Sequence, residues 1–375
     1  MFSQGEIIFL AVLGGLSLLH WLYYLVVSGQ ISYYREPEMK GKINYPPVSV
    51  VISARNEAEN LIEYLPAILN QDYPEFEVVV VNDRSVDETQ EILKALELRH
   101  ENLRLSLVKH TELYWGGKKF ALTMGIKAAK YEHLVLTDAD CVPVSNQWLK
   151  AMSRGFLRQR RVILGYGAYS KGTGLLNKLI RSETFLIAQQ YLGLARLGLP
   201  YMGVGRNIAY RSELFFDNKG FASHQEVISG DDDLFINEVA TRKNASIAFG
   251  KDHYTLSVPE KRFSDYLHQK RRHLTTSIRY SAGSQAALLL ISLLHYSFYA
   301  AVGLSFMILP FIWPGLIAIT VNTGVIILVS YPALRKTDSM DLLFWTPLTE
   351  WFTLLFYPFA FIWNTLISGS PWKNF

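Results

Sequence analysis

The chain has 375 residues with 37 basic and 33 acidic side chains, which give a formal net charge of +4. Half of the residues are hydrophobic and only 19% are charged, against about 25% in an ordinary soluble domain, so we predict that part of the chain lies in lipid. This composition excludes a disordered, collagen-like or coiled-coil protein, and the single cysteine, Cys141, excludes an internal disulfide.

The first predicted element in chain order is a membrane anchor over residues 1–34. Residues 7–27 carry no charge, and their number fits a bilayer core, which needs about 20 apolar residues per helix. No basic residue precedes this apolar run and no small-residue cleavage site is evident. Both observations disfavour a cleaved signal peptide.

Residues 35–279 alternate between short apolar, β-branched runs and helical segments. This alternation predicts an α/β fold with a parallel-rich sheet and helices on both faces. Ligands bind such sheets at the carboxyl ends of the strands, and polar clusters follow three of the runs, at residues 55–57, 83–85 and 138–140. No Walker A or dinucleotide-binding loop is present, which counts against an ATP or dinucleotide site. The predicted strands cover residues 48–53, 77–81, 103–108 and 133–137. Three helices are predicted: the first ends near residue 70, the second begins at residue 87, and the third covers residues 118–130.

Two motifs in this region suit a phosphorylated ligand with a cation. Asp138-Ala139-Asp140 places two carboxylates at a strand end, where they either share a divalent cation or are solvated turn residues. Gly116-Gly117-Lys118-Lys119 precedes a predicted helix. Its free N–H groups and lysine favour phosphate, and the alternative is an ordinary flexible loop.

Two further clusters are candidates for the chemistry itself. Asp231, Asp232 and Asp233 are consecutive carboxylates. Their mutual repulsion raises the pKa of one member, as a general base requires, and the alternative is a helix N-terminus that favours acids. Residues 269–273, Gln-Lys-Arg-Arg-His, form either a cationic clamp on a leaving diphosphate or the basic flank of a membrane span.

Residues 174–199 predict an amphipathic helix, which is either interfacial or part of the domain core. Residues 280–375 predict further membrane helices, at 285–309 and 311–330, and a weaker segment at 342–367 that contains Pro347, Glu350 and Pro358.

Basic residues at the ends of the spans predict the orientation of the chain. We predict an integral protein of a bacterial plasma membrane with four spans, both termini outside and residues 35–279 in the cytoplasm. If the fourth segment does not cross, the C-terminus lies inside. The charge excess is too small and scattered for a nucleic-acid partner. The basic residues are Arg35, Lys40 and Lys42, then Lys270, Arg271, Arg272 and Arg279, and then Arg335 and Lys336.

Taken in order, these motifs resemble the membrane-embedded family 2 glycosyltransferases with a GT-A fold, over about residues 46–275. Polysaccharide synthases and ceramide glucosyltransferase-like enzymes share this layout. The ordered series is far more specific than any single motif. It consists of Ala54-Arg55-Asn56-Glu57, Val81-Asn82-Asp83-Arg84-Ser85-Val86-Asp87, Gly117-Lys118, Thr137-Asp138-Ala139-Asp140, Gly203-Val204-Gly205-Arg206-Asn207, Gly230-Asp231-Asp232 and Gln269-x-x-Arg272.

The resemblance implies inverting transfer of a sugar from a UDP-sugar to a membrane lipid, with Mg²⁺ or Mn²⁺ as the metal. It implies that Asp232 is the catalytic base, and that Asp231 replaces the glutamate of the family's Glu-Asp pair. Gln269 and Arg272 then stabilise the departing UDP. The remaining implied roles are nucleotide binding by Ala54, Glu57, Asp83, Lys118 and Asp138, and metal binding by Asp140.

One position departs from the family pattern, because His273 stands where the Gln-x-x-Arg-Trp motif has its tryptophan. That tryptophan forms the floor of the acceptor site in processive synthases. Its absence favours a lipid acceptor over a growing glycan. Processive polysaccharide synthesis remains the near alternative. A transporter is disfavoured by the few spans and the single intramembrane acid, Glu350, and an inactive scaffold by the presence of all the expected carboxylates.

Overall fold

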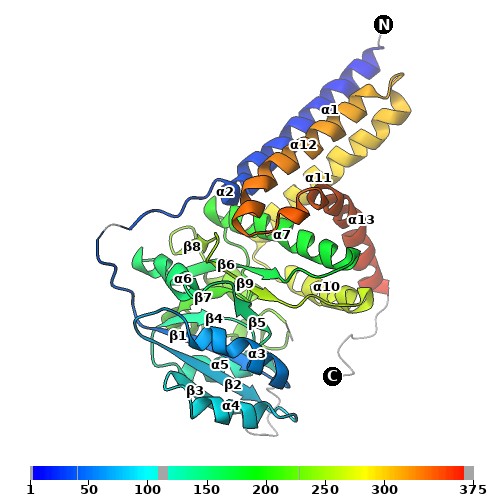
Figure 1. Ribbon diagram of the computed structural model, residues 1–375. Helices are drawn as coiled ribbons and strands as arrows, with labels where there is room; N and C mark the ends of the chain where they lie inside the picture. The colour runs from blue at the N-terminus through cyan, green and yellow to red at the C-terminus, as the bar shows by residue number, and fades with distance from the viewer. Residues whose placement is uncertain (1–2, 40, 109–116, 228, 367–375) are drawn as a thin grey trace.

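The structure is a computed structural model that describes residues 3–39, 41–108, 117–227 and 229–366 (Figure 1). It consists of an α/β domain and a bundle of long helices that projects from one side of this domain, with the N-terminus at the far end of the bundle. Lys40 and Gly116, which belong to predicted motifs, lie outside the described residues.

Nine strands of the described chain form one mixed sheet in the order β3-β2-β1-β4-β7-β6-β9-β5, with β8 paired to β6. The strands β3, β2, β1 and β4 are parallel, whereas β7 runs antiparallel to β4 and β6. The predicted parallel-rich sheet is therefore confirmed, and its four predicted strands are present. The strands are β1 (Val48–Ala54), β2 (Phe76–Asp83), β3 (Leu103–Val108), β4 (His133–Leu136), β5 (Cys141–Pro143), β6 (Val162–Tyr169), β7 (Ile208–Arg211), β8 (Ala245–Ala248) and β9 (Tyr254–Ser257).

Helices cover both faces of this sheet. Alternate residues of a strand point to opposite faces, so a strand that is apolar throughout needs a helix on each side. Ile52 of β1 packs in one core with Leu61 and Leu65 of α3, whereas its neighbour Val51 packs in a second core with Leu122 of α5. The helices of the domain are α3 (Ala58–Leu69), α4 (Thr89–Glu97), α5 (Lys118–Ala128), α6 (Trp148–Leu157), α7 (Leu175–Arg196), α8 (Ser212–Asp217), α9 (Asp233–Val239) and α10 (Phe263–Ser277).

Three helical segments of the described chain are long and apolar enough to cross a membrane. The first is the continuous segment Gln4–Ser32, which comprises α1 (Gln4–Tyr23), a π-helical turn (Tyr24–Ser28) and α2 (Gly29–Ser32). The others are α11 (Ala282–Ile308) and α12 (Trp313–Lys336). The weaker fourth segment forms α13 (Trp345–Leu366), which is not among the three candidates and bends away from the bundle to lie beside α7 and α10 (Figure 1).

The predicted amphipathic helix is α7, and it lies inside the molecule between the sheet and the helical bundle (Figure 1). Its buried Glu183 accepts hydrogen bonds from Tyr266 of α10 and Tyr357 of α13, and it pairs with Lys270 of α10 at 2.7 Å. These contacts favour the core interpretation over the interfacial one. They also remove Lys270 from the predicted cationic clamp, because its ammonium is buried in this ion pair.

Gly193 allows α7 to touch the first candidate membrane segment, since a Cβ at this position would lie 2.2 Å from the carbonyl oxygen of Val27. We expect Gly193→Ala to cost about 1–3 kcal/mol of stability, because a rigid backbone cannot yield as a flexible side chain does. Thermal unfolding in detergent measures this effect. Gly14→Ala is the matched control, because the space around Gly14 is open, and equal loss in both variants would contradict the prediction.

Candidate active site

Three of the predicted nucleotide-binding residues lie at the carboxyl ends of the neighbouring strands β1 and β2. Ala54 ends β1 and Asp83 ends β2, and both are buried. The Asp83 carboxylate accepts a hydrogen bond from Arg84 Nε at 2.8 Å. Glu57 precedes α3 and accepts a hydrogen bond from Asn60 Nδ2 at 2.6 Å. These side chains therefore share one edge of the sheet, as predicted.

The loops after β1 and β2 are joined to each other, which the sequence motifs alone did not predict. The backbone N–H of Asn56 donates to Ser85 Oγ, and Asn56 Oδ1 accepts from the N–H of Val86, both at 2.9 Å. Asn56 and Arg84 have φ angles of 56° and 54°, in the left-handed region that asparagine tolerates better than most residues. This cross-link holds the two polar loops in fixed relative positions.

Lys118 is the first residue of α5 and brings two distant motifs together. Its Nζ lies 2.8 Å from Asp138 Oδ1 and 3.1 Å from Asp231 Oδ2. Desolvation lowers the pKa of Lys118, but Asp138 and Asp231 outweigh it and raise the pKa well above its ordinary value. The lysine therefore stays charged and partly neutralises both carboxylates. Its side chain remains 37% exposed, so a phosphorylated ligand can reach it.

Asp232 lines a cleft together with Lys118, Asp138 and Gly205. Asp232 Oδ2 accepts a hydrogen bond from the N–H of Gly205 at 2.6 Å. Burial raises the pKa of Asp232 to about 7, with further contributions from the charges of Asp231 and Asp233 and opposition from Lys118. The predicted repulsion within the acidic triplet is thus present, but desolvation is the larger cause. A carboxyl group with this pKa can accept a proton at neutral pH.

Asp233 points away from the cleft and has a different task. Its Oδ2 accepts hydrogen bonds from the hydroxyl groups of Thr276, near the end of α10, and of Tyr280. Its Oδ1 accepts from the N–H of Leu234 at the start of α9. Asp233 therefore anchors the triplet to the segment that leads into α11, while Asp231 and Asp232 line the cleft.

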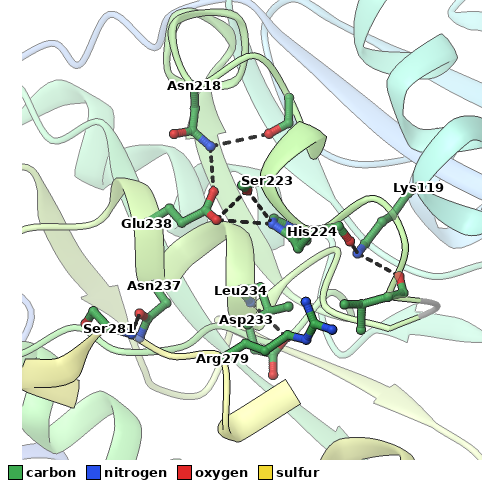
Figure 2. A network of polar contacts seen from close by, with 12 residues as sticks. Lys119, Asn218, Ser223, His224, Asp233, Leu234, Asn237, Glu238, Arg279 and Ser281 are labelled. Atoms are coloured by element: carbon green, nitrogen blue, oxygen red, sulfur yellow. Dashed lines mark hydrogen bonds and ion pairs between the residues drawn. The ribbon is translucent and has the colours of Figure 1, made fainter. Parts of the chain in front are cut away.

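A polar network holds the loop that leads into the triplet (Figure 2). Lys119 donates to the carbonyl oxygens of His224 at 2.6 Å and Val227 at 2.9 Å. The His224 ring lies 3.2 Å from Glu238 of α9, and Ser223 bonds to the same carboxylate. Burial lowers the pKa of Lys119 to about 8. The two predicted lysines thus divide their work, since Lys118 faces the cleft and Lys119 supports the loop.

Asp138 and Asp140 form a pair of carboxylates suited to a divalent cation. Their oxygens and the sulfur of Cys141 lie within 4.8 Å of one another. Burial and the charge of Asp138 raise the pKa of Asp140, and a cation offsets both effects. The pKa of Glu57 is also raised, first by burial and then by Asp140 and Asp138. This concentration of negative charge fits Mg²⁺ or Mn²⁺, which prefer oxygen ligands.

Gln269 and Arg272 lie one turn apart on α10, beside a cation–aromatic pair. Gln269 Nε2 donates to the hydroxyl of Tyr169 at 3.2 Å, and the guanidinium of Arg206 lies 4.1 Å from the centre of the Tyr169 ring. Arg272 is exposed. Among the described contacts, Gln269 therefore joins Tyr169 rather than the cluster of Lys118 with Asp138 and Asp231.

Arg206 is the main site residue to which the sequence assigned no role. Its guanidinium donates to the carbonyl oxygen of Ala168 at 3.1 Å and to Ser257 Oγ at 3.0 Å. Its backbone carbonyl accepts from the hydroxyl groups of Thr137 and Thr255, both at 2.9 Å. These bonds fix the loop that presents the Gly205 N–H to Asp232. The motif Gly203–Asn207 was the available signal, but its pattern does not reveal which atom faces the carboxylate.

Comparison with known proteins places this geometry in context. Residues 49–217 match the family model described as glycosyl transferase family 2. The chain is 35% identical over 95 residues to the poly-β-1,6-N-acetyl-D-glucosamine synthase of Staphylococcus epidermidis, covering 25% of this chain and 22% of that protein. It is 36% identical over 107 residues to the glycosyltransferase AglE of Haloferax volcanii, covering 28% of this chain and 34% of AglE. The matches thus span about a third or less of these relatives.

Among solved structures, the chain is similar in fold to the mannosyltransferase PcManGT from Pyrobaculum calidifontis, in a complex with GDP-Man and Mn²⁺. The TM-score is 0.56 at 21% sequence identity, and the match covers 93% of this chain and 99% of the other. The predicted GT-A fold is therefore confirmed.

Proposed function

We propose that this chain, whose residues 49–217 match the family 2 glycosyltransferase model, transfers a sugar from a UDP-sugar to a hydroxyl group of a membrane lipid, with inversion at the anomeric carbon. The observation that carries this proposal is the position of Asp232. A carboxylate with a pKa of about 7 lies in one cleft with a lysine and Asp138, beside the carboxyl ends of the strands. Glycosyl transfer needs a base for the acceptor proton, here Asp232, and positive charge near the diphosphate, here Lys118 and a cation held by Asp138 and Asp140.

In this proposal the chain's own residues divide into donor binding and proton transfer. Ala54, Glu57 and Asp83 bind the nucleoside at the strand ends, and Lys118 bonds to the phosphates. Asp232 takes the proton from the acceptor hydroxyl, whose oxygen attacks the anomeric carbon from the face opposite the leaving diphosphate. The bond from that carbon to the diphosphate breaks in the same step, and the configuration inverts.

Gln269, Arg272 and Asp231 have supporting roles in the proposal. Gln269 and Arg272 stabilise the departing diphosphate from α10. Asp231 keeps Lys118 in place through their 3.1 Å ion pair. This assignment places the diphosphate between α5 and α10.

Asp140 and Asp138 would hold the divalent cation, which when bound neutralises charge on the diphosphate. The GDP-Man and Mn²⁺ in the PcManGT complex support the combination of nucleotide sugar and metal. That complex contains a guanosine nucleotide, so donor screening includes GDP-sugars as well as UDP-sugars.

The candidate spans support a membrane acceptor and an integral membrane location. Three helical segments of the described chain meet the requirements for crossing a bilayer, and α7 packs between them and the sheet. We place the domain on the cytoplasmic side of a bacterial plasma membrane, because basic residues flank the spans on that side. A lipid head group then enters the cleft from the bilayer beside α10 and α11.

A processive polysaccharide synthase is the second candidate, favoured by the match to the Staphylococcus epidermidis synthase. His273 argues against it, since an imidazole offers a sugar a smaller stacking surface than an indole.

Transfer is tested in purified membranes with Mg²⁺ or Mn²⁺ and radiolabelled UDP- and GDP-sugars, followed by extraction into organic solvent. Label in a discrete glycolipid supports the proposal. Label in a long water-soluble polymer supports the second candidate, and no nucleotide release with any donor contradicts both.

The pH dependence of transfer follows from the raised pKa of Asp232. The base works only when deprotonated, so kcat/KM is expected to fall about tenfold per pH unit below pH 7. An aspartate with its ordinary pKa of about 3.9 would stay active to much lower pH. The profile is measured with a saturating metal concentration and a short incubation. Constant kcat/KM between about pH 8 and pH 5 would contradict the assignment of Asp232 as the base.

A further inference from the structure

Outside the transfer site, two histidines and a glutamate converge within the helical bundle. His20 lies on α1, His295 on α11 and Glu350 on α13, and one ligand atom from each lies within 4.8 Å of the others. His20 Nε2 is 3.4 Å and His295 Nε2 is 3.9 Å from the same oxygen, Glu350 Oε1. The residues are far apart in sequence, so the fold itself assembles this cluster.

The Nδ1 atom of each histidine faces a hydrogen-bond acceptor outside the cluster, which leaves Nε2 facing Glu350. Nδ1 of His295 lies 2.7 Å from the carbonyl oxygen of Ile291, which can only accept a hydrogen bond. Nδ1 of His20 lies 2.8 Å from Oδ1 of Asn322 on α12. The amide nitrogen of Asn322 donates to the hydroxyl of Tyr299, so its Oδ1 faces His20 as an acceptor. With a proton on each Nδ1, both Nε2 atoms present lone pairs. Metal-binding histidines are commonly oriented in this way.

The converging atoms lie close to one another and to the hydroxyl groups of Tyr24 and Tyr299, but three of them form no hydrogen bond of ordinary length and angle. His20 is fully buried and Glu350 is 5% exposed. His20 Nε2 and both carboxylate oxygens of Glu350 have no hydrogen-bond partner within the described structure. Buried polar atoms without a hydrogen bond are costly, and a buried acid packed against candidate membrane helices points to a functional site.

We propose that His20, His295 and Glu350 bind a divalent transition-metal ion, with Zn²⁺ as the best fit. Imidazole nitrogens favour zinc over Mg²⁺ or Ca²⁺, which prefer oxygen. Bonds of about 2.0–2.2 Å in a tetrahedral arrangement put neighbouring ligand atoms about 3.3–3.6 Å apart. The observed separations of 3.4 and 3.9 Å are close to this range.

The surroundings leave room for a fourth ligand to the ion, and they indicate that the ion would hold several helices together. His295 and Glu350 line a cavity of about 170 Å³ between α7 and the bundle, which leaves room for a water molecule as the fourth ligand. The first membrane segment also becomes π-helical at Tyr24, one turn after His20, and such turns are frequent at functional sites. The ion joins α1, α11 and α13, and Asn322 extends the site to α12.

The test uses the full chain purified in detergent, without a polyhistidine tag, after addition of Zn²⁺ and dialysis. Mass spectrometry of the metal content is expected to find roughly one tightly held zinc ion per chain. Zinc affinity is expected to fall at least tenfold in Glu350→Gln and in the double variant His20→Gln, His295→Gln. Asp140→Asn is the matched control, because it alters the transfer site and leaves this site intact.

A second measurement needs no variant and therefore does not depend on whether the variants fold. X-ray absorption at the zinc edge of the unaltered protein is expected to show two imidazole ligands together with oxygen. Absence of retained zinc, or zinc without imidazole scattering, would overturn the proposal. Retention at unchanged affinity in the double variant, or loss in Asp140→Asn, would overturn it equally.

Discussion

Asp232→Asn is expected to lower kcat by about 1,000-fold while leaving donor binding unchanged. The amide has nearly the same shape as the carboxyl group and still accepts the hydrogen bond from Gly205. It cannot take a proton from the acceptor, so the step that depends on a base is lost. Sugar transfer is measured with a saturating donor, and nucleotide binding is measured separately by calorimetry.

Asp217→Asn is the matched control for this substitution, because it makes the same chemical change at an exposed side chain of α8. Its activity is expected to equal that of the unaltered protein. If Asp232→Asn keeps substantial turnover, Asp232 is not the base. If it loses nucleotide binding to the same extent as transfer, the carboxylate acts on the donor instead.

Lys118→Met is expected to reduce kcat/KM by about 100-fold, mainly through weaker donor binding. Methionine keeps much of the length of the side chain but removes the ammonium that lies between Asp138 and Asp231. Because Lys118 lowers the pKa of Asp232, its loss raises that pKa further. The acid limb of the pH profile is therefore expected to move to higher pH, a shift that lost packing alone would not produce.

Lys127→Met provides the control on the same helix, since Lys127 is exposed in the last turn of α5. It is expected to change neither kcat/KM nor the pH profile. A Lys118→Met variant with normal donor affinity would argue against contact with the phosphates. An unchanged acid limb would argue against electrostatic coupling between Lys118 and Asp232.

The centre of the parallel sheet was largely predictable because β1 and β2 are buried on both faces. Such strands read as nearly continuous β-branched runs, and the runs at 48–53 and 77–81 correspond closely to these two strands. The strands β7 and β9, which run antiparallel and parallel to β6 respectively, are short, with four residues each. Their pairing with β6 is set by contacts between distant segments, which no local pattern records.

The candidate site was predictable to the extent that its residues lie directly after strands or at a helix start. Asp83, Asp138 and Lys118 are in this class. The division of labour in the acidic triplet was not predictable, because the partners of Asp233 are Thr276 and Tyr280, more than 40 positions away. Sequence can identify adjacent acids, but only the fold determines the direction of each side chain.

If the three candidate spans cross a bilayer, helix α7 fixes the distance between the cleft and that bilayer. Tyr191 bonds to the carbonyl oxygen of Gly165 in β6, while Gly193, on the same helix, lies against Val27 of the first membrane segment. Helix α7 thus links the sheet to the first candidate membrane segment, and the hydrogen bond from the hydroxyl of Tyr254 in β9 to the carbonyl oxygen of Thr337 after α12 reinforces this link. The lipid acceptor of the proposed function would then have to present its hydroxyl group at one height above the acyl chains, so that head-group length, as well as head-group chemistry, would determine which lipids are accepted.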